Sequence, residues 1–520
     1  MRKYWITISL VIIILTSFLL MFFSARQDSL TVDEKVHISA GFLHVWQGDY
    51  TFNSEHPPLL NDLAGLFAKI ARPNLPERPL NTFDATEQWD FGDLFFYESG
   101  NNVEAIIFWA RLPFILLTLG LIYLCFLFGK AVFGKKAGLL AAALAGFSPN
   151  ILAHGRLATT DIGVAFFFLL TVWLLRKYFL KPSWINALIL GIGIGFTILS
   201  KFSGLLILPV VLGGSIIFWV KAVTLRKPLF LKYFNQFLFV IFTATILIWS
   251  VYLFSMRAQV DGALIRAPID KFLQGWQILA DHNQAGHWNY LNGVVNYQGW
   301  WYYFLAVLWY KLTLPVLILL GLAIFFSRYK KDFLGEYLLI FPGLLFLGVS
   351  LTSHIDIGIR HILSVLPFIF IFISGLANVK NLILKPIIWL LVAGHILVGI
   401  LAFPNYLAYF NQIAGGSQNG LKHLSDSNLD WNQNVKRFAE YAKENNINHI
   451  YELCWDQGSF EYYGIRNDIL PNSPVNGVVV ICAQQLVITP EGFDFSWVTK
   501  YPLMTSLAIL FMFGVLTKND

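Results

Sequence analysis

The chain has 520 residues, of which 56% are hydrophobic and only 13% charged, and its mean hydropathy is +0.60. Soluble domains carry about 25% charged residues, so this composition excludes an ordinary soluble protein, and the 16% of aromatic residues excludes a disordered chain. The net charge of +6 comes from basic residues placed between apolar runs rather than from a basic patch, which excludes a nucleic-acid partner. We therefore expect a protein of the lipid bilayer.

Apolar runs of roughly 17 to 25 residues, the length that crosses a bilayer, recur from the N-terminus to about residue 403. They predict eleven membrane helices, near residues 4–24, 105–129, 137–153, 160–177, 184–200, 203–221, 233–255, 311–327, 334–351, 361–379 and 386–403. The first run is long and lacks a small-residue cleavage site before Arg26, so we interpret it as an uncleaved anchor.

Charged residues divide the connecting loops into two classes. Loops such as 130–136 and 328–332 are rich in Lys and Arg, and the positive-inside rule places them in the cytoplasm together with the N-terminus. The segment 25–104 instead carries thirteen acidic residues against five basic ones. This segment is expected outside, and an odd number of spans places the region after residue 403 outside as well. We thus predict a multi-pass plasma-membrane protein whose functional face is extracytoplasmic.

The C-terminal region has shorter apolar runs than the rest of the chain. A helix-like segment, 434–445, precedes short apolar runs at 450–454, 475–482 and 507–515, which Asn, Gly, Pro and Asp separate. This spacing predicts a small α/β domain. We therefore expect a membrane module over 1–403, with outer loops 25–104 and 256–300, and an extracytoplasmic α/β domain over 404–520. Cys454 and Cys482 could form a disulfide if this region lies in an oxidising compartment.

Acidic residues mark two of the outer loops. Asp33 and Glu34 come just after the first membrane exit, and adjacent carboxylates can remove a proton from a hydroxyl or hold a divalent cation. The alternative is that Thr31 or Asp33 caps a helix over 34–47, with Glu34 near the positive end of that helix. Asp161 lies where the chain re-enters the membrane, a position that is costly for a carboxylate unless it is paired, coordinated or hydrated. The acids of the two loops could converge on one ion or one reacting hydroxyl.

Basic residues also occur at outer helix ends. Lys201 is expected at a hairpin tip, and Arg360 with His361 at a helix start, where the helix dipole and backbone N–H groups favour an anion such as phosphate. For Lys311 we expect a side chain that reaches toward lipid headgroups. Arg111 could pair with one of the acids instead of contacting a substrate.

Several short motifs together resemble one known family. They are Asp33-Glu34, His56-Pro57-Pro58-Leu59, Ser148-Pro149-Asn150, His154-Gly155-Arg156, Thr160-Asp161, Lys201, Gly358-Ile359-Arg360-His361 and Asp426-Ser427-Asn428-Leu429-Asp430-Trp431. This set resembles the polyprenyl-phosphate-sugar-dependent glycosyltransferases of the GT-C superfamily, near the protein O-mannosyltransferases and the aminoarabinose transferases. Aminoarabinose transferases typically have Lys before Pro-Pro-Leu, whereas this chain has His56, which puts a phosphate contact there in doubt.

The resemblance implies a polytopic α-helical membrane protein of GT-C type. Its implied activity is transfer of a sugar from a polyprenyl-phosphate donor to a hydroxyl of a protein, lipid or glycan acceptor on the outer face, with inversion at the anomeric carbon. The resemblance implies that Asp33 is the catalytic base, that Glu34 is its neighbour in the paired-acid motif, and that Asp161 is the second acid of the site. Lys201, Arg360 and His361 are implied donor-phosphate residues, and Glu55, His56 and Arg156 are candidates for substrate binding.

Other functions remain open at this point. A flippase or transporter of lipid-linked sugars would place charges in mid-helix rather than at outer helix ends, and a non-catalytic scaffold would use the C-terminal domain to bind a cell-envelope partner. A divalent cation held by Asp33 and Asp161 is a further expectation, because two close carboxylates repel each other unless a positive charge intervenes. Arg111 or Arg156 could supply that charge equally well, and no histidine is assigned as a ligand.

Overall fold

The computed structural model describes residues 4–76, 87–224, 230–255, 268–326, 333–454, 458–489, 492–494, 496–500, 503–507 and 510–515. The expected outer loop 256–300 is described only from residue 268, and the basic loop 328–332 lies outside the described residues. Helices dominate, and a five-stranded sheet lies near the C-terminus. The prediction of a helical membrane protein with a small C-terminal α/β region is confirmed.

Seven helical segments in the described part of the chain are long and apolar enough to cross a membrane. Four of them are α1 (Trp5–Ala25), α5 (Val103–Phe133), α8 (Thr160–Leu180) and α17 (Leu384–Leu401). The other three are Phe202–Val220 in η3 (Phe202–Leu206) and α10 (Ile207–Thr224), Leu231–Leu253 in α11 (Phe230–Ser255), and Ile359–Asn378 in η4 (Ile359–Val365), α16 (Leu366–Ser374) and η5 (Gly375–Asn378). The helices α13 (Tyr303–Lys311) and α14 (Leu314–Phe326) are long and apolar enough only when taken together, and they are bent by 114° at their junction, as in a broken span or a re-entrant loop. The apolar helices α9 (Trp184–Ser200) and Leu334–Ser350, within α15 (Phe333–Ser350), are shorter.

The expected helix 137–153 is divided into α6 (Lys135–Gly146) and α7 (Pro149–His154). Pro149 has no N–H with which to continue the helix, and it takes the first turn of α7, where that group is not needed. The Ser148 hydroxyl caps the new helix by accepting from the N–H of Ile151. Neither piece is long enough to span a bilayer.

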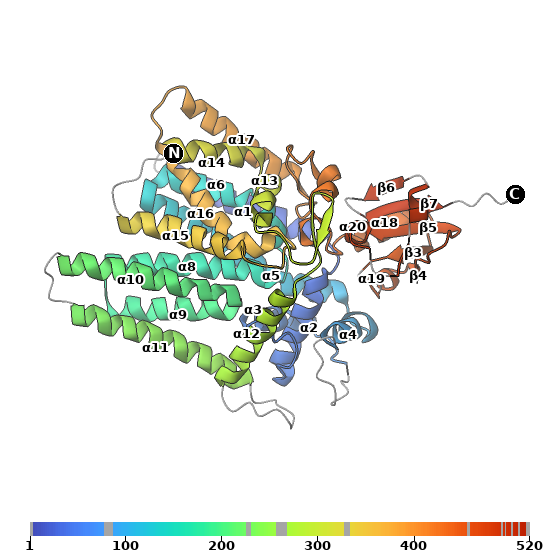
Figure 1. Ribbon diagram of the computed structural model, residues 1–520, viewed down its shortest axis with the longest axis horizontal. Coiled ribbons are helices and arrows are strands. Elements are labelled where there is room, and N and C mark those ends of the chain that lie inside the picture. Colours follow the sequence, from blue (N-terminus) through green and yellow to red (C-terminus); the bar gives the residue numbers. More distant parts are fainter. Residues whose placement is uncertain are drawn as a thin grey trace.

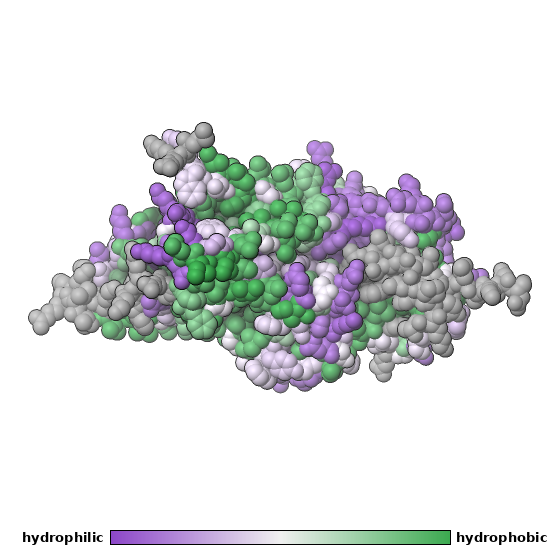
Figure 2. Space-filling view, turned by 90° about the horizontal axis from the view of Figure 1, so that it is seen from above, coloured by the Kyte–Doolittle hydropathy of each residue, from purple (hydrophilic) through white to green (hydrophobic). Residues whose placement is uncertain are grey.

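Polar elements gather at one end of the helix bundle. Figure 1 shows α2 (Val32–Gln47), α3 (Leu59–Ala68), α4 (Glu87–Asp93) and the C-terminal sheet at the same end, with the N-terminus toward the other end. In Figure 2, hydrophobic side chains cover the middle of the molecule, and hydrophilic ones lie toward both ends, with a large group at the end that carries the sheet. The long helices therefore present the apolar surface that a bilayer requires, and the polar end carries the loops expected outside.

Helices α2 and α3 cross at two glycines. A Cβ on Gly41 would lie 1.8 Å from the carbonyl oxygen of Asn61, and one on Gly65 would lie 2.0 Å from the carbonyl carbon of Gly41. Only glycine permits this backbone approach. The crossing holds the start of α2, with Asp33, close to the turn before α3, with His56; the His56 ring is centred 4.9 Å from that of His37 on α2.

The C-terminal unit is a sheet in the order β4-β3-β5-β7-β6. The strands β3 (His449–Leu453), β4 (Arg466–Ile469) and β5 (Gly477–Cys482) run parallel, whereas β7 (Leu510–Val515) and β6 (Leu503–Leu507) are antiparallel. Helices α18 (Val435–Glu444), α19 (Gly458–Tyr462) and α20 (Ala483–Val487) complete the unit. Cys454 and Cys482 form a disulfide between the ends of β3 and β5.

The apolar side chains of residues 404–434 pack with the helices rather than with the sheet. Tyr406, Leu407 and Trp431 share an apolar cluster with Met21 and Leu152, and Phe410 and Leu429 belong to the main core of the bundle. The separate core of the sheet unit begins at Val435. The expected boundary at 403/404 stays a prediction, but these contacts favour a boundary near residue 434.

Candidate active site

A cavity of about 1550 Å³ lies at the polar end of the bundle. Residues from α2, from the segment 201–206, from α12 (Pro268–Ala285), from η4 (Ile359–Val365) and from the segment 426–432 line it, together with α20. Six candidate site residues are among the lining residues: Asp33, Glu55, His56, Lys201, Arg360 and His361. Parts of the chain that are far apart in sequence therefore contribute to one concave site.

Four charged residues form a connected chain at this cavity. Nη1 of Arg360 lies 2.5 Å from Oδ2 of Asp33 and 3.9 Å from Oδ2 of Asp161. Nζ of Lys201 donates to Oδ1 of Asp161 at 2.6 Å. The two acids thus converge, as the sequence suggested, but Arg360 bridges them and not Arg111 or Arg156.

Arg360 is held from both sides. Its Nε donates to Oγ of Ser427 at 3.0 Å, and its guanidinium carbon lies 4.3 Å from the centre of the Trp431 ring. The N–H of Ile359 donates to Oδ1 of Asn428 at 3.0 Å. The segment Asp426–Trp431, to which the sequence analysis assigned no role, therefore orients Arg360. The sequence could not predict this contact, because Arg360 lies some seventy residues before Ser427 and Trp431 in the chain.

Asp33 differs from the neighbouring carboxylates in its exposure. Its side chain is 23% exposed, whereas those of Asp161 and Glu34 are 1% and 0% exposed. A base must contact the proton that it removes. Of these three carboxylates, Asp33 is the one whose geometry allows contact with a molecule in the cavity.

Glu34, expected as a partner of Asp33 in catalysis, is sealed inside the protein. Its two oxygens accept from Nε and Nη2 of Arg111 at 2.8 and 2.6 Å, from the N–H of Ala158 at 2.8 Å and from the N–H and hydroxyl of Thr31. Burial alone would raise the pKa of Glu34, but the adjacent Arg111 brings the net pKa below its ordinary value. Glu34 does not line the cavity, and its contacts are those of a structural anchor that caps α2.

Arg156, expected as a candidate for substrate binding, does not line the cavity either. It donates to Oδ2 of Asp28 at 2.9 and 2.5 Å, and its guanidinium lies 5.5 Å from the ring centre of Tyr406. Asp28 also pairs with Arg437 of α18 at 2.6 Å. Asp28 was missed from the sequence because it stands in a string of polar residues with no distinguishing pattern.

Glu55 and His56 border the cavity from the turn before α3. Oε1 of Glu55 accepts from the amides of Asn53 and Gln88 at 3.3 and 3.1 Å. Burial, with positive charges nearby, lowers the pKa of His56 well below its ordinary value. This shift disfavours the charged form of the His56 ring, which is the form that would attract a phosphate. His361 lines the same cavity, with its Nε2 buried and without a partner among the described residues.

Lys311, expected to reach toward headgroups, is instead buried. Its Nζ donates to the carbonyl oxygens of Leu407 and Asn428 at 2.8 and 2.6 Å and lies 4.5 Å from the ring centre of Phe410. These bonds fasten the segment that holds Arg360, because Asn428 itself binds the backbone of Ile359.

Lys311→Met should therefore destabilise the protein, since methionine keeps the length of the side chain but leaves two buried carbonyl groups without a donor. Each such group costs about 1–3 kcal/mol. Thermal unfolding in detergent measures the effect. Lys422→Met, at an exposed position at the end of η6 (Ser417–Lys422), is the matched control and should leave the midpoint unchanged. Equal midpoints for both variants would contradict the anchoring role.

Asp33 and Asp161 do not fit the expected metal site as they stand. Each is bonded to a cationic side chain, and among the described residues no group of three or more His, Cys, Asp or Glu side chains is arranged to hold an ion. Arg360 and Lys201 supply the positive charge that the two acids need. The divalent cation itself stays a prediction.

Comparison with known proteins gives one family and several similar structures. A family model described as dolichyl-phosphate-mannose-protein mannosyltransferase matches residues 98–249, which is less than half of the chain. No curated protein sequence matches the chain significantly.

Two similar structures are of ArnT from Cupriavidus metallidurans. The form bound to undecaprenyl phosphate is 12% identical, with 98% of each chain covered and a TM-score of 0.52. The apo form is 14% identical, with 97% of each chain covered and the same TM-score of 0.52. The oligosaccharyltransferase AglB from Archaeoglobus fulgidus, 14% identical over 93% of this chain and 70% of its own, has a TM-score of 0.48. The expected resemblance to the GT-C superfamily is confirmed at the level of the fold.

Proposed function

Because the chain has a GT-C fold, we propose that it is a membrane glycosyltransferase that moves a sugar from a polyprenyl-phosphate donor to a hydroxyl acceptor on the extracytoplasmic face, with inversion. The observation that carries this proposal is the open carboxylate of Asp33, bonded to Arg360 in a cavity at the polar end of a membrane bundle. A hydroxyl acceptor needs a base, and a lipid phosphate needs a cation near the membrane surface. The cavity offers both.

Arg360 and Lys201 are the proposed partners of the donor phosphate. Arg360 suits bidentate contact with phosphate oxygens, and both cations can stabilise the negative charge that develops as the phosphate leaves. Apolar side chains of Leu205, Phe304 and Phe346 line the same cavity and provide a surface compatible with a polyprenyl tail. His361, with its unpartnered Nε2, is a further candidate for a phosphate contact.

In the proposed step, Asp33 removes the proton of the acceptor hydroxyl as that oxygen attacks the anomeric carbon. The new bond forms on one face of the sugar while the bond from the anomeric carbon to the phosphate oxygen breaks on the other. Polyprenyl phosphate leaves with the electron pair, and Asp33 retains the proton. A single displacement of this kind inverts the anomeric carbon and requires no covalent sugar–enzyme intermediate.

The decisive experiment is the release of free polyprenyl phosphate by the purified protein from a panel of polyprenyl-phosphate sugars. A glycosyltransferase cleaves this bond, whereas a flippase or a scaffold leaves it intact. We expect release with at least one donor, together with a glycosylated product. Binding or movement of every donor without cleavage would refute the proposal and favour a transporter.

We also propose that the N-terminus is cytoplasmic and that the cavity and the sheet unit are extracytoplasmic, in the plasma membrane. The charge asymmetry of the loops and the location of α2–α4 and the sheet at one end of the bundle support this orientation (Figure 1). Single cysteines introduced near residue 133 and at exposed position 412 test it in intact cells. An impermeant reagent should label position 412 and not position 133; the reverse pattern would overturn the orientation.

A further inference from the structure

The cavity has a second wall that the proposed donor chemistry does not use. Asp430 and Asn432 contribute to it from the segment after η7 (Asp426–Asn428), and Gln484 and Gln485 contribute from α20 of the sheet unit. We call these four residues the amide wall. They bring side chains from the C-terminal unit into the same cavity as Asp33.

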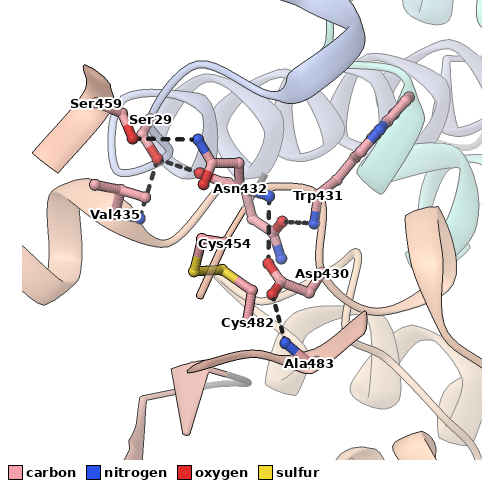
Figure 3. Close-up of a disulfide and its surroundings, with 10 residues drawn as sticks. Ser29, Asp430, Trp431, Asn432, Val435, Cys454, Ser459, Cys482 and Ala483 are labelled. Carbon is pink, nitrogen blue, oxygen red and sulfur yellow. Dashed lines mark hydrogen bonds between the residues drawn. A yellow bond between two sulfur atoms is a disulfide. The ribbon is translucent and has the colours of Figure 1, made fainter. Parts of the chain in front are cut away.

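Direct contacts join the amide wall to the charged cluster. Trp431 lies against Arg360, and the adjacent Asp430 accepts from the N–H of Ala483 at 3.0 Å through Oδ2. Oδ1 of Asp430 accepts from the N–H of Asn432 at 3.2 Å. Figure 3 shows Asp430 and Ala483 beside the disulfide that includes Cys482, the residue before α20. The start of α20 is thus held in place relative to Arg360.

Within the amide wall, Gln485 has an unsatisfied polar atom that a ligand could bind. Its side chain is 2% exposed, yet its Oε1 is buried and has no hydrogen-bond partner in the described part of the protein. Such a group is costly to leave unpaired, and native structures rarely do so. Gln485 lines the cavity, so a rotation of its side chain would bring this oxygen to a donor group on a molecule bound there.

The charges around the cavity restrict the kind of molecule. Six acidic residues line it: Asp33, Glu55, Asp90, Asp93, Asp426 and Asp430. The Lys and Arg residues that line the cavity within the described chain are Lys35, Lys201 and Arg360, and each pairs with an acid: Asp93, Asp161 and Asp33. Once a donor phosphate occupies Arg360 and Lys201, the remaining lining charge is acidic, which repels a second anion.

We propose that the amide wall binds the acceptor, and that the acceptor is a neutral carbohydrate. This inference rests on the proposed function and names its acceptor class. Side-chain amides and carboxylates match the dense hydroxyl groups of a sugar, which both donate and accept hydrogen bonds. Trp89, Trp276 and Trp288 also line the cavity, and their rings offer apolar faces for the C–H surface of a sugar.

Binding measurements on the full-length protein in detergent, saturated with polyprenyl phosphate, test the proposal. The probes are mannotriose and maltotriose, the same sugars carrying a phosphate, and a Ser/Thr-rich peptide. We expect at least one neutral trisaccharide to bind saturably and its phosphorylated form to bind at least tenfold more weakly. Tighter binding of the peptide, equal binding of the phosphorylated sugar, or no binding of either neutral sugar would overturn the proposal.

Variants locate the site. Gln485→Ala should weaken binding of the neutral sugar about 5- to 100-fold, the range expected for loss of one hydrogen bond to a buried group. Gln412→Ala, at an exposed position, is the control and should bind normally. Gln485→Asn keeps the amide but shortens the side chain by one methylene, so it should fold and also bind the neutral sugar more weakly. If Gln485→Ala fails to fold, Gln485→Asn decides, and normal binding of the neutral sugar by Gln485→Asn would count against the amide wall.

Separate assays of donor binding and donor cleavage test the proposed function independently of acceptor binding. Binding of polyprenyl phosphate and cleavage of a polyprenyl-phosphate sugar depend on Arg360 and Lys201 rather than on the amide wall. Normal donor binding and cleavage without carbohydrate binding would refute this inference and leave the proposed function standing. Failure of donor binding and cleavage would instead refute the proposed function.

Discussion

Replacing Asp33 with asparagine is expected to lower the rate of sugar transfer by about 10²–10⁴-fold, the usual contribution of a general base. Asparagine has nearly the same shape and retains an oxygen that can accept from Arg360, which lies 2.5 Å from Oδ2 in the native protein. It cannot take up the proton of the acceptor hydroxyl. The variant should therefore fold and bind the donor while turning over slowly. Single-turnover assays with a donor that the native enzyme cleaves measure the chemical step directly.

Asp90→Asn is the matched control for this experiment. Asp90 is an exposed acid that lines the same cavity but is outside the chain of ion pairs that links Asp33, Arg360, Asp161 and Lys201. Its replacement should leave the rate unchanged. Near-normal turnover by the Asp33 variant would refute the role of Asp33 as the base and direct the search to Glu55 or Asp161.

The second large effect concerns stability. Glu34→Gln is expected to destabilise the protein by about 3–5 kcal/mol, because it removes one charge of a buried ion pair and leaves Arg111 without its counter-charge. Glutamine also has only one oxygen, whereas Glu34 accepts from Arg111, Ala158 and Thr31 through two. Activity should then fall through loss of folded protein rather than through the chemical step.

Thermal unfolding in detergent, together with turnover per folded molecule, separates these two effects. Glu98→Gln, at an exposed position, is the control and should change neither. An unaltered midpoint for Glu34→Gln combined with a lost chemical step would show that Glu34 acts in catalysis, as the paired-acid motif first implied.

The local sequence alone predicted those helices and caps that depend only on the composition of their own segment. Long apolar runs such as 105–129 and 386–403 became α5 and α17, because any segment of that length and hydropathy gains by leaving water. The capping interpretation of Thr31 to Glu34 also holds, since a capping box involves only neighbouring residues. Pro149 shows the limit of this reasoning: a run of the right composition was divided because one residue could not donate a hydrogen bond.

The sequence by itself also marked the charged residues near the site, because an ion at a membrane helix end is conspicuous against apolar neighbours. Which charge meets which was decided by the tertiary structure. Asp33 and Glu34 are adjacent in the chain, yet one faces the cavity and the other is enclosed by Arg111. Asp33 meets Arg360 across 327 positions, and Trp431 completes that contact from a third segment. Coulomb attraction and burial act through space, so only the packing of α2, η4 and the segment 426–432 could assign these roles.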